Sequence, residues 1–548
     1  MAERIRIKDI AKMADVSVGT VDRVIHGRSG VSEASRKRVE EILKQLDYQP
    51  NMYASALASN KKYTFSCLLP QHEKGEYWTA VEAGIQDALV AYSDFNISVN
   101  LSYYDPVPTT MMPNDDLDLQ VLWACKLATD WKGVVCRDNF AKAWPECIAF
   151  PFDEYGVAIR NLRRGIPAPY SGSYDNWFTD GLGAAIRSEL WACLAPGNPA
   201  LAVQYAFEDA CVDHAGNGIY AEQFLAALES LAFTHSDPRE LIRMALEHIP
   251  ADSTLACAIR DTVAWCDKDA AWESVRTNIM KKYGSVNFTD VKMNLPFVTM
   301  ALLLGGGDFG KSICLAVNCG QDADCTGATI GAILGILNPS GIPEEWLKPI
   351  GHSLVVSPEI TGIQPPDTLE KFTDLVLSLR ETVTLSVPPL PPFDPAAYAI
   401  PARRSIFHPW FAADFRKFHP IPMDNPETIL LPGSCSTIDF TSLPGNSMWV
   451  LEIKFHLERA QKIRLLVSTP ANLQVRVDGV FRFGRESGGM LPAFHRAMQN
   501  QLAELELEQG THSLQIALAP ASPEMKSAEL VFGIADTTNH WLPHAFEV

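Results

Sequence analysis

The sequence has no run of about 18 apolar residues, so nothing in it predicts a segment that spans a membrane. Its N-terminus, MAERIRIKDIAK, is charged and lacks the apolar core of a secretion signal. The 12 cysteines are scattered, with no CxxC pair and no dense framework. This usage is typical of reduced thiols. Together these absences predict a soluble cytoplasmic protein.

The chain is long and acidic, but its charge is uneven. Its 548 residues suffice for several domains, and a 47% hydrophobic content can build substantial cores. A formal net charge of −19 argues against a protein that coats nucleic acid along its whole length. Residues 1–62 are the exception, with 12 Lys and Arg against 8 Asp and Glu. A nucleic-acid-binding module is therefore expected at this end of the chain.

Residues 5–48 are expected to form three short helices joined by tight turns. Val16 to Ile25 contains a turn and then a helix, with Ser17 as its N-cap. Ser32 caps a third helix, whose apolar residues recur at helical spacing at Val39, Ile42, Leu43 and Leu46. Such an arrangement is typical of a helix-turn-helix, which lays its second helix in the major groove of DNA.

The stretch KDIAKMADVSVGTVDRVIHGRSGVSEASRKRVEEILKQLDYQPNMYASALAS resembles the DNA-binding head of the LacI repressor family over its whole length. The resemblance implies a head and hinge over residues 1–62 that bind operator DNA as a homodimer. It also assigns roles: base reading to Val18, Gly19 and Arg23, phosphate contacts to Ser17, Thr20 and Asn51, and a minor-groove wedge to Leu57 in a hinge helix. Since Val18 and Gly19 have no side-chain hydrogen-bonding group, direct readout would depend on Arg23.

Residues 63–106 show the pattern of a strand, a helix and a second strand. An apolar run from Thr64 to Leu69 precedes a helical face, and residues 97–101 then alternate in polarity. This pattern resembles the first β-α-β unit of the sugar-sensing domain in the LacI family. The many further units of that domain are missing, so the unit is expected to be a truncated remnant.

Two acidic clusters predict a metal site. The stretch VNCGQDADCTGATIGAILG (Val317 to Gly335) places Asp322 and Asp324 beside Cys325. A second cluster, Asn114 to Asp118, precedes another helical pattern. Paired carboxylates suit hard divalent cations, although each cluster taken alone could simply cap a helix. Glycines at every fourth position of the first stretch predict a smooth helix face for close packing, at Gly327, Gly331 and Gly335.

Together these clusters resemble the ADP-ribosylglycohydrolase family over residues 108–382. The resemblance implies hydrolysis of an N- or O-glycosidic bond to ADP-ribose or a related glycosyl group. It also implies two Mg²⁺ ions, with Mn²⁺ as an alternative, held by Asn114, Asp115, Asp116, Asp322, Asp324 and Cys325. Cys325 stands where the family has Thr or Ser, and a thiol is a poor Mg²⁺ ligand. The family's opening Gly-Asp-x-x-Gly helix and its glutamate have no match upstream of Asp115, so Asp118 is our hypothesis for the catalytic base.

Further candidate residues lie between the two clusters. A loop just ahead of a helix is predicted to bind a pyrophosphate through Asp175, Asn176, Gly181 and Gly183. The family resemblance places His214 near the substrate, although a lone histidine is more often structural. Arg187 and Glu189 follow the loop; they could bind substrate, and we favour pairing with surface neighbours instead.

Beyond a proline-rich linker, the period of the apolar pattern changes from helical to two. Residues 449–455, 462–467 and 473–477 alternate in polarity, and Asp478-Gly479 is a hairpin signal. These features predict a β-sandwich. It resembles the accessory jelly-roll modules of carbohydrate-active enzymes, so sugar binding is one hypothesis, and a structural or dimerising role is an equal alternative.

The expected architecture is therefore multidomain. It has an all-α helix-turn-helix head (1–62), a short β-α-β remnant (63–106), a mostly α-helical glycohydrolase-like domain (107–382), a linker (383–401) and an all-β sandwich (402–548). The expected function is a DNA-binding, regulator-like head fused to a metal-dependent hydrolase. The alternative is a LacI-type regulator whose large domain is a catalytically silent ligand sensor.

Overall fold

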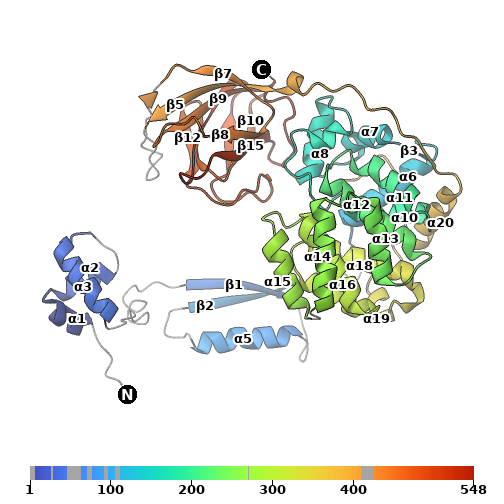
Figure 1. Cartoon of the computed structure of the whole chain (residues 1–548), viewed down its shortest axis with the longest axis horizontal. Helices are drawn as coiled ribbons and strands as arrows, with labels where there is room; N and C mark the ends of the chain where they lie inside the picture. The colour runs from blue at the N-terminus through green and yellow to red at the C-terminus, as the bar shows by residue number, and fades with distance from the viewer. Residues whose placement is uncertain are drawn as a thin grey trace. The chain divides into compact units, whose positions relative to one another are not determined.

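Figure 1 shows the computed structural model of the chain, which describes residues 7–25, 29–45, 63–70, 77–91, 97–104, 112–268, 271–408, 421–422 and 424–547. The chain divides into two compact units, Met1–Pro108 and Thr109–Val548. Within the described ranges, no helix combines the length and the apolar character that a bilayer crossing requires.

The head contains the three predicted helices, α1 (Ile7–Ala14), α2 (Val18–Ile25) and α3 (Glu33–Gln45). Their inward side chains form one small core, in which Ile10, Val21 and Val39 are fully buried. The Ser17 Oγ accepts a hydrogen bond from the Thr20 N–H at 3.1 Å, and Ser17 therefore caps the start of α2 as predicted.

The residues predicted to contact DNA lie on the outside of this small bundle. Ser17, Val18, Gly19 and Arg23 are exposed, and Thr20 is half-buried. The apolar Val18 is 51% exposed at the first position of α2, which leaves it free for a contact outside the head. The other two predicted residues, Asn51 and Leu57, and the hinge that contains them lie outside the described residues.

The strand-helix-strand unit is also present. Strand β1 (Tyr63–Pro70) pairs in parallel with β2 (Ile97–Tyr104), and α5 (Tyr77–Ala91) connects them. Phe65 and Leu68 on β1 are more than half exposed. Parallel sheets are normally covered on both faces, so this exposure fits a unit that lacks the rest of a larger sheet.

The second unit begins with a mostly helical domain. Its α-helices are α6 (Asp115–Ala128), α7 (Arg137–Cys147), α8 (Asp153–Arg163), α9 (Tyr170–Ser173), α10 (Ser188–Leu194), α11 (Pro199–Ala210), α12 (Asn217–Ala232), α13 (Pro238–Ala245), α14 (Thr254–Lys268), α15 (Trp272–Tyr283), α16 (Val291–Gly305), α17 (Phe309–Asn318), α18 (Ala323–Leu337), α19 (Glu344–Leu347) and α20 (Leu369–Arg380). Short 3₁₀ turns, η2 (Ala185–Arg187), η3 (Leu246–His248) and η4 (Pro339–Gly341), lie between them. Helix α12 is buried along most of its length and packs against α10, α11, α13, α16 and α18, as expected of a helix that is apolar on most faces.

Helix α18 uses its glycines for close packing, as predicted. A Cβ atom on Gly327 would lie 3.0 Å from a methyl group of Val317, and one on Gly331 would lie 3.7 Å from Ile313. Both neighbours belong to α17. The small residues therefore let α17 approach α18 closely and fix the start of α18, which carries the acidic cluster of Asp322 and Asp324.

A β-sheet region forms the C-terminal part of the chain. Its strands are β5 (Ile400–His408), β6 (Ile421–Pro422), β7 (Glu427–Leu431), β8 (Cys435–Asp439), β9 (Met448–Leu457), β10 (Gln461–Ser468), β11 (Asn472–Val477), β12 (Val480–Arg485), β13 (Leu502–Leu507), β14 (Gly510–Ala519) and β15 (Ser527–Ala535). One antiparallel sheet has the order β13-β10-β15-β8, and the other has β12-β11-β14-β9-β5-β6, with β7 on β5. Alternating residues of both sheets share one apolar core, including Phe455, Leu465 and Phe532. We call this region the β domain.

The segment that joins the helical domain to the β domain is largely exposed but contacts the helical domain at several points. Strand β4 (Thr384–Leu385) pairs with β3 (Val134–Val135). Phe393 stacks on Tyr170 with ring centroids 4.6 Å apart, and η5 (Pro395–Tyr398) leads into β5. Figure 1 shows this segment crossing the helical domain before it enters the sheets.

A buried ion pair of the helical domain also contacts the β domain. The side chain of Asp175 is only 1% exposed, and its carboxylate lies 3.1 Å from the Arg160 guanidinium. The same carboxylate accepts hydrogen bonds from the Ser434 hydroxyl and the Cys435 N–H of the β domain. The Arg160 guanidinium also lies 4.6 Å from the ring of Trp541. Asp175 is therefore held between the two domains.

We predict that Asp175→Ala lowers the free energy of unfolding by about 3 kcal/mol or more, because it leaves the buried Arg160 charge without its carboxylate. Urea unfolding followed by tryptophan fluorescence measures this change. The matched control is Asp267→Ala, which removes the partner of Arg239 from a pair in which both side chains are 52% exposed. The control substitution should lower the free energy of unfolding by less than about 1 kcal/mol. Equal effects of the two substitutions would contradict the prediction.

Candidate metal centre

The two acidic clusters lie at the starts of two helices that meet in space. Asn114 is the N-cap of α6, and its side chain accepts a hydrogen bond from the Leu117 N–H at 3.3 Å. Asp322 is the N-cap of α18, but its carboxylate makes no capping hydrogen bond. Helix N-termini carry partial positive charge, and this makes it less costly to place several carboxylates here.

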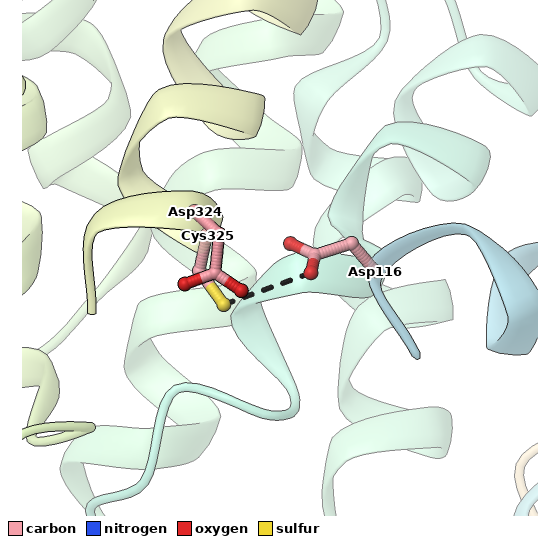
Figure 2. A group of neighbouring side chains, drawn as sticks. All are labelled: Asp116, Asp324 and Cys325. Carbon is pink, nitrogen blue, oxygen red and sulfur yellow. Dashed lines mark hydrogen bonds between the residues drawn. The ribbon is translucent and has the colours of Figure 1, made fainter. Parts of the chain in front are cut away.

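Three potential ligand atoms come together between these helices. One atom each from Asp116, Asp324 and Cys325 lie within 4.8 Å of one another. The Cys325 Sγ donates to Asp116 Oδ2 at 3.7 Å (Figure 2). Asp116 and Cys325 are buried, whereas Asp324 is exposed. The group, which we call the Asp-Asp-Cys group, is therefore open to solvent on the Asp324 side.

Electrostatics favour a cation at the Asp-Asp-Cys group. Burial raises the pKa of Asp116 well above its usual range, and the charges of Asp115 and Asp324 add to this effect. Burial also raises the pKa of Asp322 to about 7, and Asp324 contributes to that increase. Burial raises the pKa of the Cys325 thiol too, so it keeps its proton. A cation among these carboxylates would relieve their mutual repulsion, while the thiol remains a weak ligand for a hard metal.

The remaining predicted acidic residues have different surroundings. Asp115 accepts a hydrogen bond from the Tyr155 hydroxyl at 3.4 Å and lies at the edge of the Asp-Asp-Cys group. Asp118 is fully buried and accepts the Ser357 N–H at 3.2 Å. Burial raises the pKa of Asp118 to about 6. Asp118 therefore belongs to the same helix as the ligands, but its carboxylate is engaged by the chain around Ser357.

Glu154, on the first turn of α8, is a candidate residue that sequence reasoning missed. Its Oε1 accepts the Gly183 N–H at 3.2 Å, whereas its Oε2 is buried and accepts no hydrogen bond from the described residues. Its negative charge helps to raise the pKa of Asp115, although burial is the larger cause. Glu154 therefore lies beside the metal centre. No motif around it in the sequence signals this position.

The glycine loop predicted to bind a pyrophosphate closes on Glu154. A Cβ atom on Gly181 or Gly183 would lie 2.6 Å or 2.5 Å from the Glu154 carboxylate. Glycine at these positions therefore leaves room for the Glu154 carboxylate. Asn176 is buried, and its amide donates to the Gly172 and Asp213 carbonyls. Asp175, as described above, faces the β domain.

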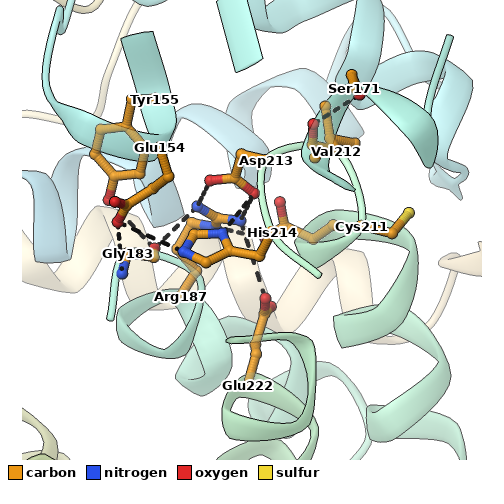
Figure 3. A network of polar contacts seen from close by, with 12 residues as sticks. Glu154, Tyr155, Ser171, Gly183, Arg187, Cys211, Val212, Asp213, His214 and Glu222 are labelled. Carbon is orange, nitrogen blue, oxygen red and sulfur yellow. Dashed lines mark hydrogen bonds and ion pairs between the residues drawn. The ribbon is translucent and has the colours of Figure 1, made fainter. Parts of the chain in front are cut away.

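A buried charge network surrounds Arg187 and connects it to His214 (Figure 3). The Arg187 guanidinium is fully buried and pairs with Asp209 at 2.9 Å and with Asp213 at 3.0 Å. Our expectation that Arg187 pairs with surface neighbours was therefore wrong. His214 lies 3.1 Å from Asp213 and 3.5 Å from Glu154. The network thus fixes one side of Glu154.

The charges of this network are set by competition between burial and pairing. Burial lowers the pKa of Arg187, but the carboxylates around it outweigh burial, and its pKa lies well above the usual range. Burial also disfavours the charged forms of Asp213 and His214. Arg187 and His214 nevertheless lower the pKa of Asp213 to about 2, and Asp213 raises the pKa of His214 to about 9. At neutral pH the histidine is therefore a cation held next to Glu154.

Two family models match the chain. The model of the ADP-ribosylglycohydrolase family matches residues 76–384, which is more than half of the chain. The model of the bacterial regulatory proteins of the lacI family matches residues 6–51. The first match begins inside the strand-helix-strand unit, ahead of residue 107, where the sequence pattern placed the start of the hydrolase-like domain.

Curated relatives match the N-terminal region. Catabolite control protein A of Streptococcus mutans is 39% identical over 95 residues, which cover 17% of this chain and 28% of that protein. Catabolite control protein A of Staphylococcus aureus is 33% identical over 117 residues, which cover 21% of this chain and 35% of that protein. The chain thus spans about a third of the length of these relatives.

Solved structures resemble the chain only weakly. A lac repressor dimer bound to operator is 24% identical over 20% of this chain and 31% of that chain, with a TM-score of 0.13. A β-glucosidase from Kluyveromyces marxianus is 7% identical over 25% of this chain and 16% of that chain, with a TM-score of 0.19. TM-scores of this size are too low to indicate a shared overall fold.

The pKa of Asp322 predicts how the stability of the metal-free protein changes with pH. Its folded-state value of about 7 lies above the ordinary 3.8, so the folded chain holds this proton more tightly than the unfolded chain. The stability that the proton contributes is complete below about pH 4 and is lost as the pH rises through 7. In EDTA, the free energy of unfolding should fall between pH 5 and 7 by up to about 1.4 kcal/mol per pH unit from this group.

Urea unfolding at pH 5, 6, 7 and 8 tests this prediction. Asp322→Asn should reduce the slope between pH 5 and 7, whereas Asp252→Asn, at an exposed loop position, should retain it. An Asp322→Asn variant with the wild-type slope would show that this carboxyl does not hold its proton in the folded chain.

Proposed function

This chain belongs to the ADP-ribosylglycohydrolase family, and we propose that its helical domain is a metal-dependent hydrolase of a glycosidic bond to ADP-ribose or a related glycosyl group. A LacI-type head precedes this domain. The observation that carries the proposal is the approach of Asp116, Asp324 and Cys325 to within 4.8 Å, at the starts of two helices 209 residues apart in sequence.

The chain offers oxygen ligands for one or two divalent cations. Asp116 and Asp324 would hold the first ion, and Asp115 and Asp322 extend the acidic surface on either side. Asn114 is a weaker candidate, since its amide oxygen already caps α6. Cys325 reduces the preference for Mg²⁺ relative to the softer Mn²⁺. A bound cation would orient sugar hydroxyls and lower the pKa of a coordinated water.

The attacking water needs a base, and two carboxylates are candidates. Asp118, the hypothesis from the sequence, is fully buried and engaged by Ser357. One Glu154 oxygen accepts no hydrogen bond from the part of the chain that the structure describes, and Glu154 lies close enough to Asp115 to shift its pKa. We therefore propose Glu154 as the first candidate and Asp118 as the second. His214 and Gly183 would then act by holding Glu154, and Asn176 and Gly181 by shaping its loop.

The substrate class rests on the family and on the acidity of the site. ADP-ribose, an ADP-ribosylated side chain and a simpler glycoside all contain the vicinal hydroxyls that metal-bound carboxylate sites orient. The alternative is a catalytically silent sensor that binds such a ligand and controls the head.

We also propose that the β domain is a sandwich, as its alternating sequence predicts.

The head is proposed to bind operator DNA as a homodimer. Its match to the lacI family model supports this proposal, as does the exposure of Val18, Gly19 and Arg23 along α2. Ser17 and Thr20, which share a hydrogen bond at the start of α2, are proposed phosphate contacts. Asn51 and Leu57 keep the roles that the LacI resemblance gives them.

We predict that the wild-type chain binds Mg²⁺ or Mn²⁺ saturably and that Asp324→Asn weakens this binding about tenfold or more. Asp324 is exposed, so its substitution should leave the fold intact. Calorimetric titration with each metal measures the affinity, and Asp252→Asn is the control for the loss of one exposed negative charge. Release of ADP-ribose from ADP-ribosylated peptides and hydrolysis of nitrophenyl glycosides then measure activity.

The outcomes of these titrations separate the two functions. Metal binding with turnover that Asp324→Asn abolishes supports the hydrolase. Metal binding and ADP-ribose binding without turnover on any of these substrates would favour the sensor. A wild-type chain that binds neither metal would remove the metal-dependent hydrolase from consideration.

For the head, we predict that Arg23→Ala weakens binding to a selected operator about tenfold or more and relaxes its base preference. Duplexes selected from a random pool by the full chain provide the operator, and fluorescence anisotropy at fixed salt measures affinity. Lys37→Ala is the control because Lys37 carries the same charge on the exposed side of α3. If both variants lose the same affinity for the operator, Arg23 contributes only its charge to DNA binding.

A further inference from the structure

One segment of the β domain leaves its sheets and packs on the helical domain. It connects β12 to β13 and covers residues 486–501, and we call it the β12–β13 segment. Its Leu491 and Phe494 join an apolar cluster with Val157 of α8. The Arg496 guanidinium pairs with Asp153, donates to Asn287 Oδ1 at 2.7 Å and lies 4.3 Å from the ring of Phe288. The segment is thus anchored by both apolar and charged contacts.

The anchor point is the start of α8, where the hydroxyl of the nearby Tyr155 donates to Asp115 of the candidate metal centre at 3.4 Å. Asp153 is the first residue of α8 and has a φ of +33°, a conformation that costs free energy for a residue other than glycine. Its ion pair with Arg496 stabilises this conformation. The next residue is Glu154, whose carboxylate points to Gly183 and His214 (Figure 3). Arg496 of the β domain therefore pairs with the residue that directly precedes Glu154.

His495 of the same segment places its imidazole ring next to the start of α8. Its imidazole lies 5.1 Å from the ring of Phe152 at an interplanar angle of 61°, and its Nδ1 lies 3.9 Å from Asp153. Its side chain remains 27% exposed. Burial and the charge of Arg496 lower the pKa of His495 to about 4, and Glu154 opposes this decrease. The imidazole is therefore neutral at neutral pH and lies within the electrostatic reach of Glu154.

Exposed apolar side chains gather around this histidine. Phe152 is 41% exposed and Phe288 is 42% exposed, and both contact His495 or its neighbour Arg496. Val286 is 53% exposed and lies beside Gly489 of the β12–β13 segment. Exposed rings next to a polar site commonly mark a binding surface. We call Phe152, Phe288 and His495 the ring cluster.

We propose that the β12–β13 segment forms one wall of the hydrolase site, and that the ring cluster binds the face of a substrate ring beyond the bond to be cleaved. This inference rests on the proposed function, because it assigns a part of the same substrate. An anionic group is disfavoured here, because Asp153 neutralises the charge of Arg496 and the charge of Glu154 reaches His495. Neutral rings instead bind the apolar face of a sugar or a nucleobase, which share this stacking chemistry.

Ligand binding to the full chain tests the proposal. The probes are adenosine, for a nucleobase, and methyl β-D-ribofuranoside, for a sugar ring, each titrated by saturation-transfer NMR in the presence of Mn²⁺. We expect at least one probe to bind. His495→Ala should weaken its binding about fivefold or more, His495→Phe should retain it within about twofold, and the affinity for Mn²⁺ should be unchanged in both variants.

The matched control is His456→Ala, which removes an exposed histidine from β9 of the same domain. If His495→Ala weakens the binding of adenosine alone, the ring cluster binds a nucleobase. If it weakens the binding of the riboside alone, the ring cluster binds a sugar ring. Equal binding by His495→Ala and the control would overturn the proposal, as would a wild-type chain that binds Mn²⁺ and neither ring. Ring binding that depends on His495 in a chain without Mn²⁺ affinity would support the ring cluster and remove the metal-dependent hydrolase.

Discussion

The buried guanidinium of Arg187 makes the ion pairs on which the proposed hydrolase site depends. It lies between α10 and the carboxylates of Asp209, Asp213 and Glu222, which come from α11, the turn after it, and α12. An uncompensated charge in such a place would cost several kcal/mol, so the carboxylates are needed to keep it. Asp213 also pairs with His214, and His214 in turn pairs with Glu154. The direction of one acidic side chain is thus set by helices distant in sequence.

The balance of charges at the candidate metal centre differs from that around Arg187. Asp116 and Asp322 are buried without a cationic side chain among the causes of their raised pKa values. Arg187, by contrast, has three acidic partners. Two helix starts supply only part of the missing positive charge. Among the described residues, the leading causes of these pKa shifts include opposite charges around Arg187 and none at the Asp-Asp-Cys group. This difference is consistent with our proposal that the group binds a metal ion.

Local patterns in the sequence predicted the parts of this structure that depend on neighbouring residues. The cap at Ser17 and the glycine face of α18 follow from short spacings, and both are present. Contacts between distant segments could not be predicted in this way. Asp175 follows an ordinary turn pattern, yet its partner Ser434 lies 259 residues away. Arg187 was misplaced because arginine is usually exposed unless paired, and its partners Asp209 and Asp213 could not be identified without the fold.

The β domain differs from a separable accessory module, because each of its main contacts completes a group in the helical domain. Without it, the buried Asp175 would lose its hydrogen bonds to Ser434 and Cys435, and Asp153 would lose the cation that stabilises its strained backbone. Arg496 pairs with the first residue of α8, next to Glu154. The described parts of the helical domain and the β domain therefore belong to one compact unit, and under our proposal the β12–β13 segment contributes to the site together with the helices.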